Sequence, residues 1–143
     1  MLGTFTINST LATILFDSGA SHSFISQMFI RQHSIPLCAL KNPILVNSPR
    51  RGMQASYFCP TIQLSLRGVE FKVNPIVLRT ARIDLILGMD WMKQHRAVVQ
   101  CKKKVVALTT PKEDRISVEV VVQEQQTATM NQLGDGARKK TQL

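Results

Sequence analysis

The stretch that decides the fold is residues 15–26, with the sequence LFDSGASHSFIS. Asp17 is the only charged side chain among the first thirty residues, and it follows a strand-like run of Thr, Ile, Leu and Phe. A carboxylate that emerges from a buried strand is costly unless hydrogen bonds, an ion pair or protonation compensates. Gly19 allows a tight turn whose backbone N–H groups point at this carboxylate, and Ser18 adds a hydroxyl group. The sequence therefore predicts a supporting turn at residues 17–19, although the tripeptide taken alone is most often a strand-ending Asx turn.

A second apolar element lies far downstream, in residues 84–92 with the sequence DLILGMDWM. With both stretches in place, the sequence resembles the retropepsin-like aspartic proteases, and more narrowly the protease domain of gypsy-type retrotransposons of plants. The resemblance runs from about Gly3 to Leu108. It implies an all-β fold, a small closed β-barrel of the retropepsin type with one or two short helices.

The resemblance also implies roles for individual residues. Asp17 matches the catalytic aspartate of the family, and Ser18 and Gly19 match its supporting turn. Residues 86–88 correspond to the strand that packs beneath the catalytic loop, and residues 49–53 correspond to the flap over the substrate. The predicted catalytic residues are Asp17, Ser18 and Gly19. The predicted substrate-binding residues are Ala20, Pro49, Arg50, Arg51, Gly52, Met53, Ile86 and Leu87.

The sequence contains a single Asp-Ser-Gly, so the second catalytic aspartate of the family must come from another molecule. Two carboxyls about 3 Å apart cannot both ionise, so one is held protonated, as in the known dyad of aspartic proteases. The ionised member accepts a proton from a bound water, which attacks the peptide carbonyl, and the protonated member donates to the developing oxyanion. We therefore expect a homodimeric endopeptidase that processes a retrotransposon polyprotein and needs no cofactor and no metal.

The rest of the chain consists of short strand-like runs with few helical stretches. We expect strands in residues 4–15 (a hairpin), 44–46 and 57–66 (a long hairpin), 69–78, 85–87, 97–101, 105–108 and 118–122, and short helices before Pro36 and over residues 90–95. This pattern fits a small β-barrel. We expect the domain to span residues 1–122, and residues 123–143, rich in Gln, Thr, Gly and Lys, to form a disordered tail or linker.

Composition limits the class of protein. The 143 residues, 44% hydrophobic and 19% charged, fit one compact domain and exclude a coiled coil. No apolar run reaches the roughly 18 residues that a membrane-spanning helix needs, so no membrane partner is expected. The three cysteines lack Cys-x-x-Cys spacing, and nothing at the N-terminus resembles a signal peptide, so we expect reduced thiols in a cytoplasmic protein, with virus-like particles as a further location. The net charge of +9 predicts weak nonspecific contact with RNA or DNA.

Two other kinds of site, a Ser-His-Asp triad and a zinc site, explain the sequence less well. A Ser-His-Asp triad would need Asp17, His22 and either Ser21 or Ser23, but side chains adjacent in sequence rarely converge, and no Gly-x-Ser-x-Gly turn is present. The histidines and cysteines are too widely spaced for a zinc site, and buried structural thiols explain the cysteines better.

Two acidic residues and a basic run remain. Asp84 and Asp90 flank the second apolar element, and we expect structural roles for both, with Asp90 at a helix start. Residues 102–104, three lysines, form a turn that is most simply solvated. The alternative to an enzyme is a catalytically silent protease-like fold that serves as a dimerisation or protein/RNA interaction module.

Overall fold

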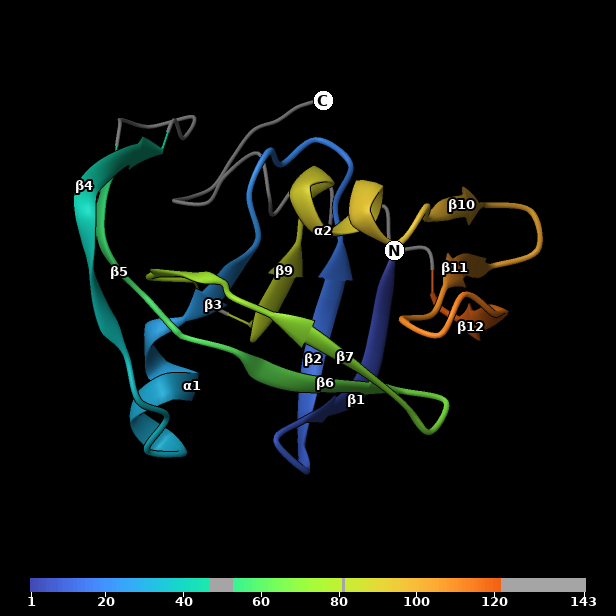
Figure 1. The fold of residues 1–143 in the computed structure, drawn as a ribbon, viewed down its shortest axis with the longest axis horizontal. Helices are drawn as coiled ribbons and strands as arrows, with labels where there is room; N and C mark the ends of the chain where they lie inside the picture. Colours follow the sequence, from blue (N-terminus) through green and yellow to red (C-terminus); the bar gives the residue numbers. More distant parts are fainter. Residues whose placement is uncertain (47–52, 81, 122–143) are drawn as a thin grey trace.

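The computed structural model describes residues 1–46, 53–80 and 82–121, which form strands and two short helices (Figure 1). The strands are β1 (Leu2–Ile7), β2 (Thr10–Phe16), β3 (Phe24–Ser26), β4 (Cys38–Val46), β5 (Met53–Phe58), β6 (Ile62–Leu66), β7 (Val69–Val73), β8 (Ile76–Leu78), β9 (Leu85–Leu87), β10 (Val98–Gln100), β11 (Val105–Thr109) and β12 (Arg115–Glu119). The helices are α1 (Gln27–Gln32) and α2 (Met89–Gln94). The prediction of a mostly β fold with one or two short helices is confirmed.

The described strands form a large and a small sheet. The large sheet has the order β4-β5-β8-β3-β9-β2-β1-β6-β7, and the small one has the order β10-β11-β12. In Figure 1 the β4–β5 hairpin lies on one side of the molecule and the small sheet on the other, with β2, β3 and β9 between them. The order begins at β4 and ends at β7, so closure of the large sheet into a barrel stays a prediction.

β1 and β2 form the predicted hairpin, in which Ile7 pairs with Thr10. Asn8 and Ser9 make the turn, with φ angles of 49° and 68°. Positive φ at both turn residues matches the right-handed twist of a hairpin, and Asn tolerates this conformation well. The hairpin leads β2 into the protein, where its last residue, Phe16, is buried.

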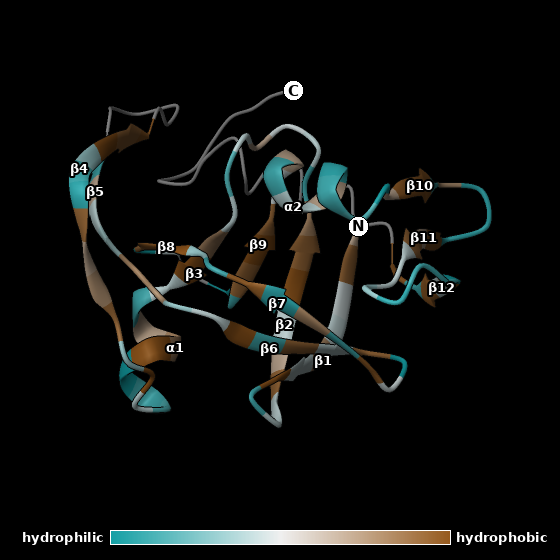
Figure 2. Cartoon of the chain, in the orientation of Figure 1, coloured by the Kyte–Doolittle hydropathy of each residue, from teal (hydrophilic) through white to brown (hydrophobic). Residues whose placement is uncertain are grey.

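β9 lies inside the large sheet, between β2 and β3. It pairs in parallel with β2, so that Leu15 lies opposite Ile86 and Phe16 lies opposite Leu87. It pairs antiparallel with β3. All three residues of β9 are buried, as expected for a short apolar strand that is covered on both faces. Figure 2 shows β3, β9 and the end of β2 as a continuous hydrophobic strip.

The buried side chains form two apolar clusters. The main core includes Phe16, Leu87, Phe71 and Trp91. The second cluster contains Leu15, Phe24, Ala55, Ile76, Ile83 and Ile86. Because successive side chains of a strand point to opposite faces, the ends of β2 and β9 each contribute to both clusters.

Two predicted strands are interrupted. Residues 57–66 are expected as one strand, but β5 ends at Phe58 and β6 begins at Ile62, after Thr61 with a φ of 39°. β5 pairs with β4 and β8, whereas β6 pairs with β1 and β7. Residues 69–78 divide in the same way at Pro75, which cannot donate to a strand ladder. Each break lets the chain change partners within the large sheet.

The described chain ends beside its beginning. Leu2 and Val121 form an antiparallel bridge, with N–H to oxygen bonds of 2.8 and 2.7 Å between the two backbones. β10 and β11 lie where the sequence predicts them, but the last strand among the described residues is β12, which begins earlier than predicted, at Arg115. The predicted flap is residues 49–53, of which residues 49–52 lie outside the described residues, as does the predicted tail at residues 123–143. Neither described helix is long and apolar enough to cross a membrane.

His95 follows α2 and is buried among aromatic rings. Its ring centroid lies 4.9 Å from that of Phe71 and 4.7 Å from that of Trp91. Its Nδ1 lies 3.2 Å from the carbonyl oxygen of Thr109. Burial lowers the pKa of His95 below its ordinary value of 6.5, and the bond to Thr109 opposes this effect in part. The folded protein therefore keeps the ring neutral at a pH where the unfolded chain is already protonated.

This difference in pKa predicts a loss of stability in acid. Below about pH 6.5 the unfolded chain binds a proton at His95 before the folded protein does, so the free energy of unfolding falls by up to about 1.4 kcal/mol per pH unit. Above that pH His95 is neutral in both the folded and the unfolded state, so it does not change the free energy of unfolding with pH. His95→Phe is expected to flatten the pH dependence of urea unfolding below about pH 6.5 relative to the wild type. Equal slopes for the wild type and His95→Phe would contradict the assignment.

Candidate active site

Asp17 lies directly after β2, and the end of β9 supports it. Its backbone N–H donates to the carbonyl oxygen of Leu87 at 3.0 Å, which extends the parallel pairing of β2 and β9 by one bond. Its side chain is half-buried. The carboxylate therefore stands where a buried strand meets a surface loop.

In the Asp-Ser-Gly turn, one backbone N–H points at the Asp17 carboxylate, as the sequence predicts. The N–H of Gly19 donates to Oδ1 of Asp17 at 2.8 Å, and the N–H of Ala20 donates to the backbone carbonyl oxygen of Asp17 at 3.2 Å. Ser18 and Gly19 are exposed. A backbone N–H that donates to a carboxylate offsets part of the cost of its burial.

The junction of β9 and α2 packs against residues 17–23, the loop that the sequence predicts to be catalytic and that we call the catalytic loop. The N–H of Met89 donates to the carbonyl oxygen of Ala20 at 2.8 Å. A Cβ atom on Gly88 would lie 2.3 Å from the carbonyl oxygen of His22 and 2.8 Å from that of Ala20. Only glycine allows this approach, so the apolar-apolar-Gly element has a direct physical role beneath the loop.

The predicted substrate-binding residues have different surroundings. Ala20 is half-buried and packs against the second apolar cluster, to which the buried Ile86 belongs. Leu87 is fully buried in the main core, and it supports Asp17 through its carbonyl oxygen rather than offering a surface to a substrate. Met53 begins β5 and pairs with Val46. Pro49, Arg50, Arg51 and Gly52 lie outside the described residues, and their substrate-binding role stays a prediction.

The two other candidate carboxylates bind backbone groups. Oδ2 of Asp84 accepts from the N–H of Thr13 at 2.8 Å. Oδ1 of Asp90 accepts from the N–H of Trp91 at 2.7 Å, in the first turn of α2. Both contacts agree with the structural roles that the sequence predicts for these residues.

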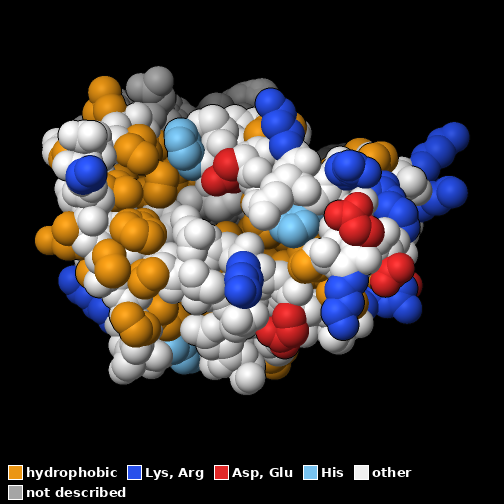
Figure 3. Space-filling model, in the orientation of Figure 1, with side chains coloured by type: hydrophobic (Ala, Val, Ile, Leu, Met, Phe, Trp, Pro, Cys, Tyr) orange, Lys and Arg blue, Asp and Glu red, His pale blue; other side chains and the backbone are white. Residues whose placement is uncertain are grey.

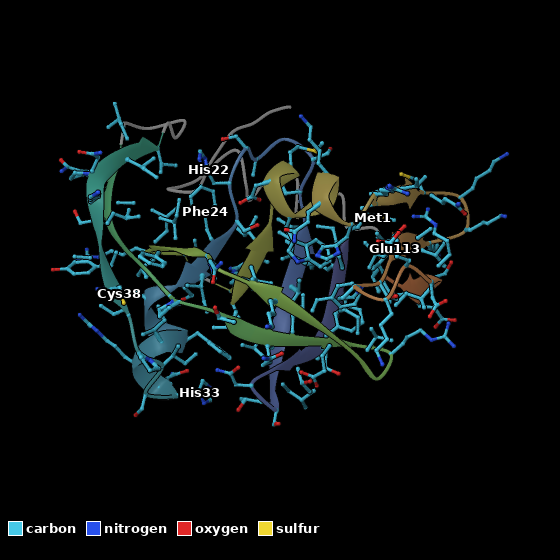
Figure 4. The ribbon with its side chains drawn as sticks, in the orientation of Figure 1. Met1, His22, Phe24, His33, Cys38 and Glu113 are labelled. Carbon is cyan, nitrogen blue, oxygen red and sulfur yellow. The ribbon has the colours of Figure 1, made fainter. Side chains whose placement is uncertain are left out.

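The remaining titratable side chains do not form a second centre in the described part of the chain. No group of three or more His, Cys, Asp or Glu residues there is arranged to hold a metal ion. Figure 4 shows His22 near Phe24 in the upper part of the view and His33 at its lower edge. Cys59 is buried, and burial raises the pKa of its thiol to about 11. Cys38 and Cys101 are exposed, so the prediction of buried thiols is wrong for these two.

The tight approach at Gly88 leads to a test of stability. Gly88→Ala places a methyl group against two carbonyl oxygens of the catalytic loop, and we expect it to lower the free energy of unfolding by about 1–3 kcal/mol. Gly68→Asn is the matched control, because Gly68 has a φ of 78° and open space around it, and Asn adopts such angles at a cost below about 1 kcal/mol. Urea unfolding of both variants measures the difference. Equal losses would mean that the loop yields freely to the added methyl.

Known proteins share this arrangement of strands. The sequence pattern of the family described as retroviral aspartyl protease matches residues 1–114. The structure is similar to that of the retroviral protease-like domain of Ddi1 from Leishmania major, with 18% identity and a TM-score of 0.63 over 87% of this chain and 95% of that chain. It is also similar to EIAV protease complexed with the inhibitor HBY-793, with 17% identity and a TM-score of 0.50 over 66% of this chain and 86% of that chain.

At these identities the two solved structures show a shared retropepsin-like fold and no more. No curated protein sequence gives a significant match. The pattern of the family, in contrast, covers most of the chain and includes the Asp-Ser-Gly turn, β9 and α2. The chain belongs to the retroviral aspartyl protease family.

Proposed function

We propose that this protein is an aspartic endopeptidase that hydrolyses peptide bonds as a homodimer, with Asp17 of each copy as a catalytic residue. The observation that carries the proposal is the support of Asp17 at the end of β2. The N–H of Gly19 holds its carboxylate at 2.8 Å, and the carbonyl oxygen of Leu87 holds its backbone at 3.0 Å. Membership of the retroviral aspartyl protease family supports the same role.

The chemistry requires a second carboxyl group. In the proposed dimer, Asp17 lies beside Asp17 of the partner subunit, and the two carboxyls share one proton because they cannot both ionise at about 3 Å. The ionised carboxylate accepts a proton from the bound water as the water attacks the peptide carbonyl. The protonated carboxyl donates its proton to the developing oxyanion. The other carboxyl, which now carries the proton taken from water, donates it to the leaving amine, and the first carboxyl regains its proton as the carbonyl re-forms. Water is the nucleophile, so no acyl-enzyme forms.

A two-fold axis is the simplest operator that brings one residue close to its own copy. The chain contains one Asp-Ser-Gly sequence. Asp84 and Asp90, which flank the apolar strand β9, accept hydrogen bonds from backbone N–H groups. These contacts favour a second copy of the chain over a second carboxylate of the same chain.

The finer proposal concerns the biological setting. We assign the protease to the polyprotein of a plant gypsy-type retrotransposon, on the motifs of residues 15–26 and 84–92, and place it in the cytoplasm or in virus-like particles. Figure 3 shows Lys and Arg side chains gathered over the small sheet, where residues 102–104 are exposed. This surface supports a weak, salt-dependent contact with RNA or DNA. The alternative remains a catalytically silent module that keeps the fold and the dimer.

The first test of the enzyme is the substitution Asp17→Asn. Asn is nearly isosteric with Asp but cannot share a proton as the dyad requires, so we expect hydrolysis to fall by at least about a thousandfold with the fold retained. Cleavage of hydrophobic peptides at acidic pH, with and without a statine-type inhibitor, measures the loss. Asp84→Asn is the control and is expected to keep most of the activity. Wild-type turnover by Asp17→Asn would end the aspartic-protease proposal.

The second test concerns the dimer. If each active site needs two chains, specific activity falls on dilution below the dimer dissociation constant, and the monomer is inactive. A single-chain dimer, with two copies joined by a flexible linker, is expected to keep its specific activity on dilution because the second copy stays at high effective concentration. Peptide cleavage and sedimentation over the same concentration range decide the matter. A fully active monomer at nanomolar concentration would exclude the homodimer.

A further inference from the structure

Ser23 and Asp90 form a hydrogen-bond network at the end of the catalytic loop. Oγ of Ser23 donates to Oδ1 of Asp90 at 2.8 Å, and the N–H of Ser23 donates to Oδ2 of Asp90 at 3.2 Å. The same Ser23 hydroxyl oxygen accepts from the N–H of Gly88 at 3.1 Å. One serine therefore joins the loop to both the end of β9 and the start of α2.

The two partners differ in their exposure. Ser23 is 2% exposed, so its hydroxyl group needs partners within the protein. Asp90 is exposed at the surface, although its carboxylate accepts three bonds, two from Ser23 and one from Trp91. A carboxylate suits this position because it is an acceptor at both oxygens, and bonds to an ionised acceptor are stronger than those between neutral groups.

These bonds hold the far end of the loop that carries Asp17. The near end is held by Asp17 itself, through its N–H bond to Leu87, and the middle by the bond from Met89 to Ala20. With Ser23 bound to Asp90, the loop is fixed at its beginning, its middle and its end. At the last point the carbonyl oxygen of Ser23 also accepts from the N–H of Ile76 at 2.9 Å, so backbone and side-chain bonds act together there. The side-chain bonds to Asp90 are the part that a substitution can remove without changing the backbone.

We infer that Asp90 is a positioning residue for peptide hydrolysis, which acts through Ser23 to set the catalytic loop and hence the Asp17 carboxylate. The inference rests on the proposed function and names a residue to which the sequence alone assigns only a helix start. In a dimer, two copies of the loop must place their carboxyls about 3 Å apart. A displacement of about 1 Å at such a site lowers the rate by about a hundredfold. The network therefore affects kcat rather than substrate affinity.

Asp84 is a matched control for Asp90. The two aspartates flank β9, and each accepts a hydrogen bond of 2.7–2.8 Å from a backbone N–H group. Asp84 bonds to Thr13 in the middle of β2, whereas Asp90 bonds to Ser23 in the loop. Asp84→Ala thus removes a similar bond at the opposite end of β9 without releasing the loop.

The kinetic experiment compares Asp90→Ala, Asp90→Asn and Asp84→Ala with the wild type, at protein concentrations where sedimentation shows the same oligomeric state. We expect Asp90→Ala to lower kcat by about 10- to 100-fold with KM changed less than about threefold. Asp90→Asn keeps the Oδ1 acceptor but turns an amide group toward the N–H of Ser23. Its kcat is therefore expected to lie between that of the wild type and that of Asp90→Ala. Asp84→Ala keeps kcat within about threefold. A kcat of Asp90→Ala within about twofold of the wild type, or an equal loss in Asp84→Ala, would overturn the inference.

A double-mutant cycle tests whether Asp90 acts through Ser23. Asp90→Ala leaves the Ser23 hydroxyl without its acceptor, and Ser23→Ala removes the hydroxyl itself. If the pair acts as a unit, the double variant loses no more kcat than the worse of the two single variants. If the fold losses in kcat of the two single variants multiply in the double variant, the two residues act independently. The inference that Asp90 acts through Ser23 would then be wrong.

A second measurement does not depend on activity. The backbone order parameter and the amide shift of Gly19 report the loop at the bond to Asp17. We expect both to change in Asp90→Ala and to stay at wild-type values in Asp84→Ala. Unchanged values in Asp90→Ala would reject the positioning role even if the wild type cleaves peptides. If the wild type cleaves no peptide, the proposed function fails, and the loop measurement still decides whether Asp90 positions Asp17.

Discussion

The parallel pairing of β2 with β9 is the interaction on which the rest of the site depends. It places Phe16 opposite Leu87, and the backbone of Asp17 then forms the next bond. Parallel strands need a long connection, and here residues 17–84 lie between them and supply most of the remaining sheet. The register is well determined because neighbouring residues of each strand enter different apolar clusters. If the pairing shifted by one residue, the side chains of Leu15 and Phe16 would exchange faces of the sheet and leave their apolar clusters. The Asp17 carboxylate would also move out of its turn.

Much of the site could be predicted because its parts are local in sequence. The Asp-Ser-Gly turn can be predicted from two local features, the cost of burying one carboxylate and the conformational freedom of one glycine. Both features are visible in residues 13–19. The two broken strands were missed for a different reason. Alternation of apolar residues reports which side chains are buried. It continues from Phe71 through Pro75, where the backbone changes partners, and it shifts by one position between Cys59 and Ile62. Periodicity carries no information about the identity of the neighbouring strand.

The contacts that join distant segments were harder to predict. Ser23 and Asp90 are 67 positions apart, and a serine-rich loop gives no sign of which serine is buried. Strand geometry alone separates two of the predicted substrate-binding residues. Ile86 and Leu87 are neighbours in a strand, so their side chains must point to opposite faces and cannot both line one binding surface. The alternation assigns Ile86 to the second cluster beside Ala20 and leaves Leu87 in the main core.

The bridge between Leu2 and Val121 brings the beginning and the end of the described chain together at one point. A domain with adjacent entry and exit points is easily accommodated within a longer chain, because the segments on either side need not be pulled apart. The same geometry suits circular permutation. A short linker from Val121 to Leu2, with new ends opened in the exposed turn of residues 102–104, would preserve every strand neighbour. The spatial order of the strands is thus independent of the position at which the chain begins.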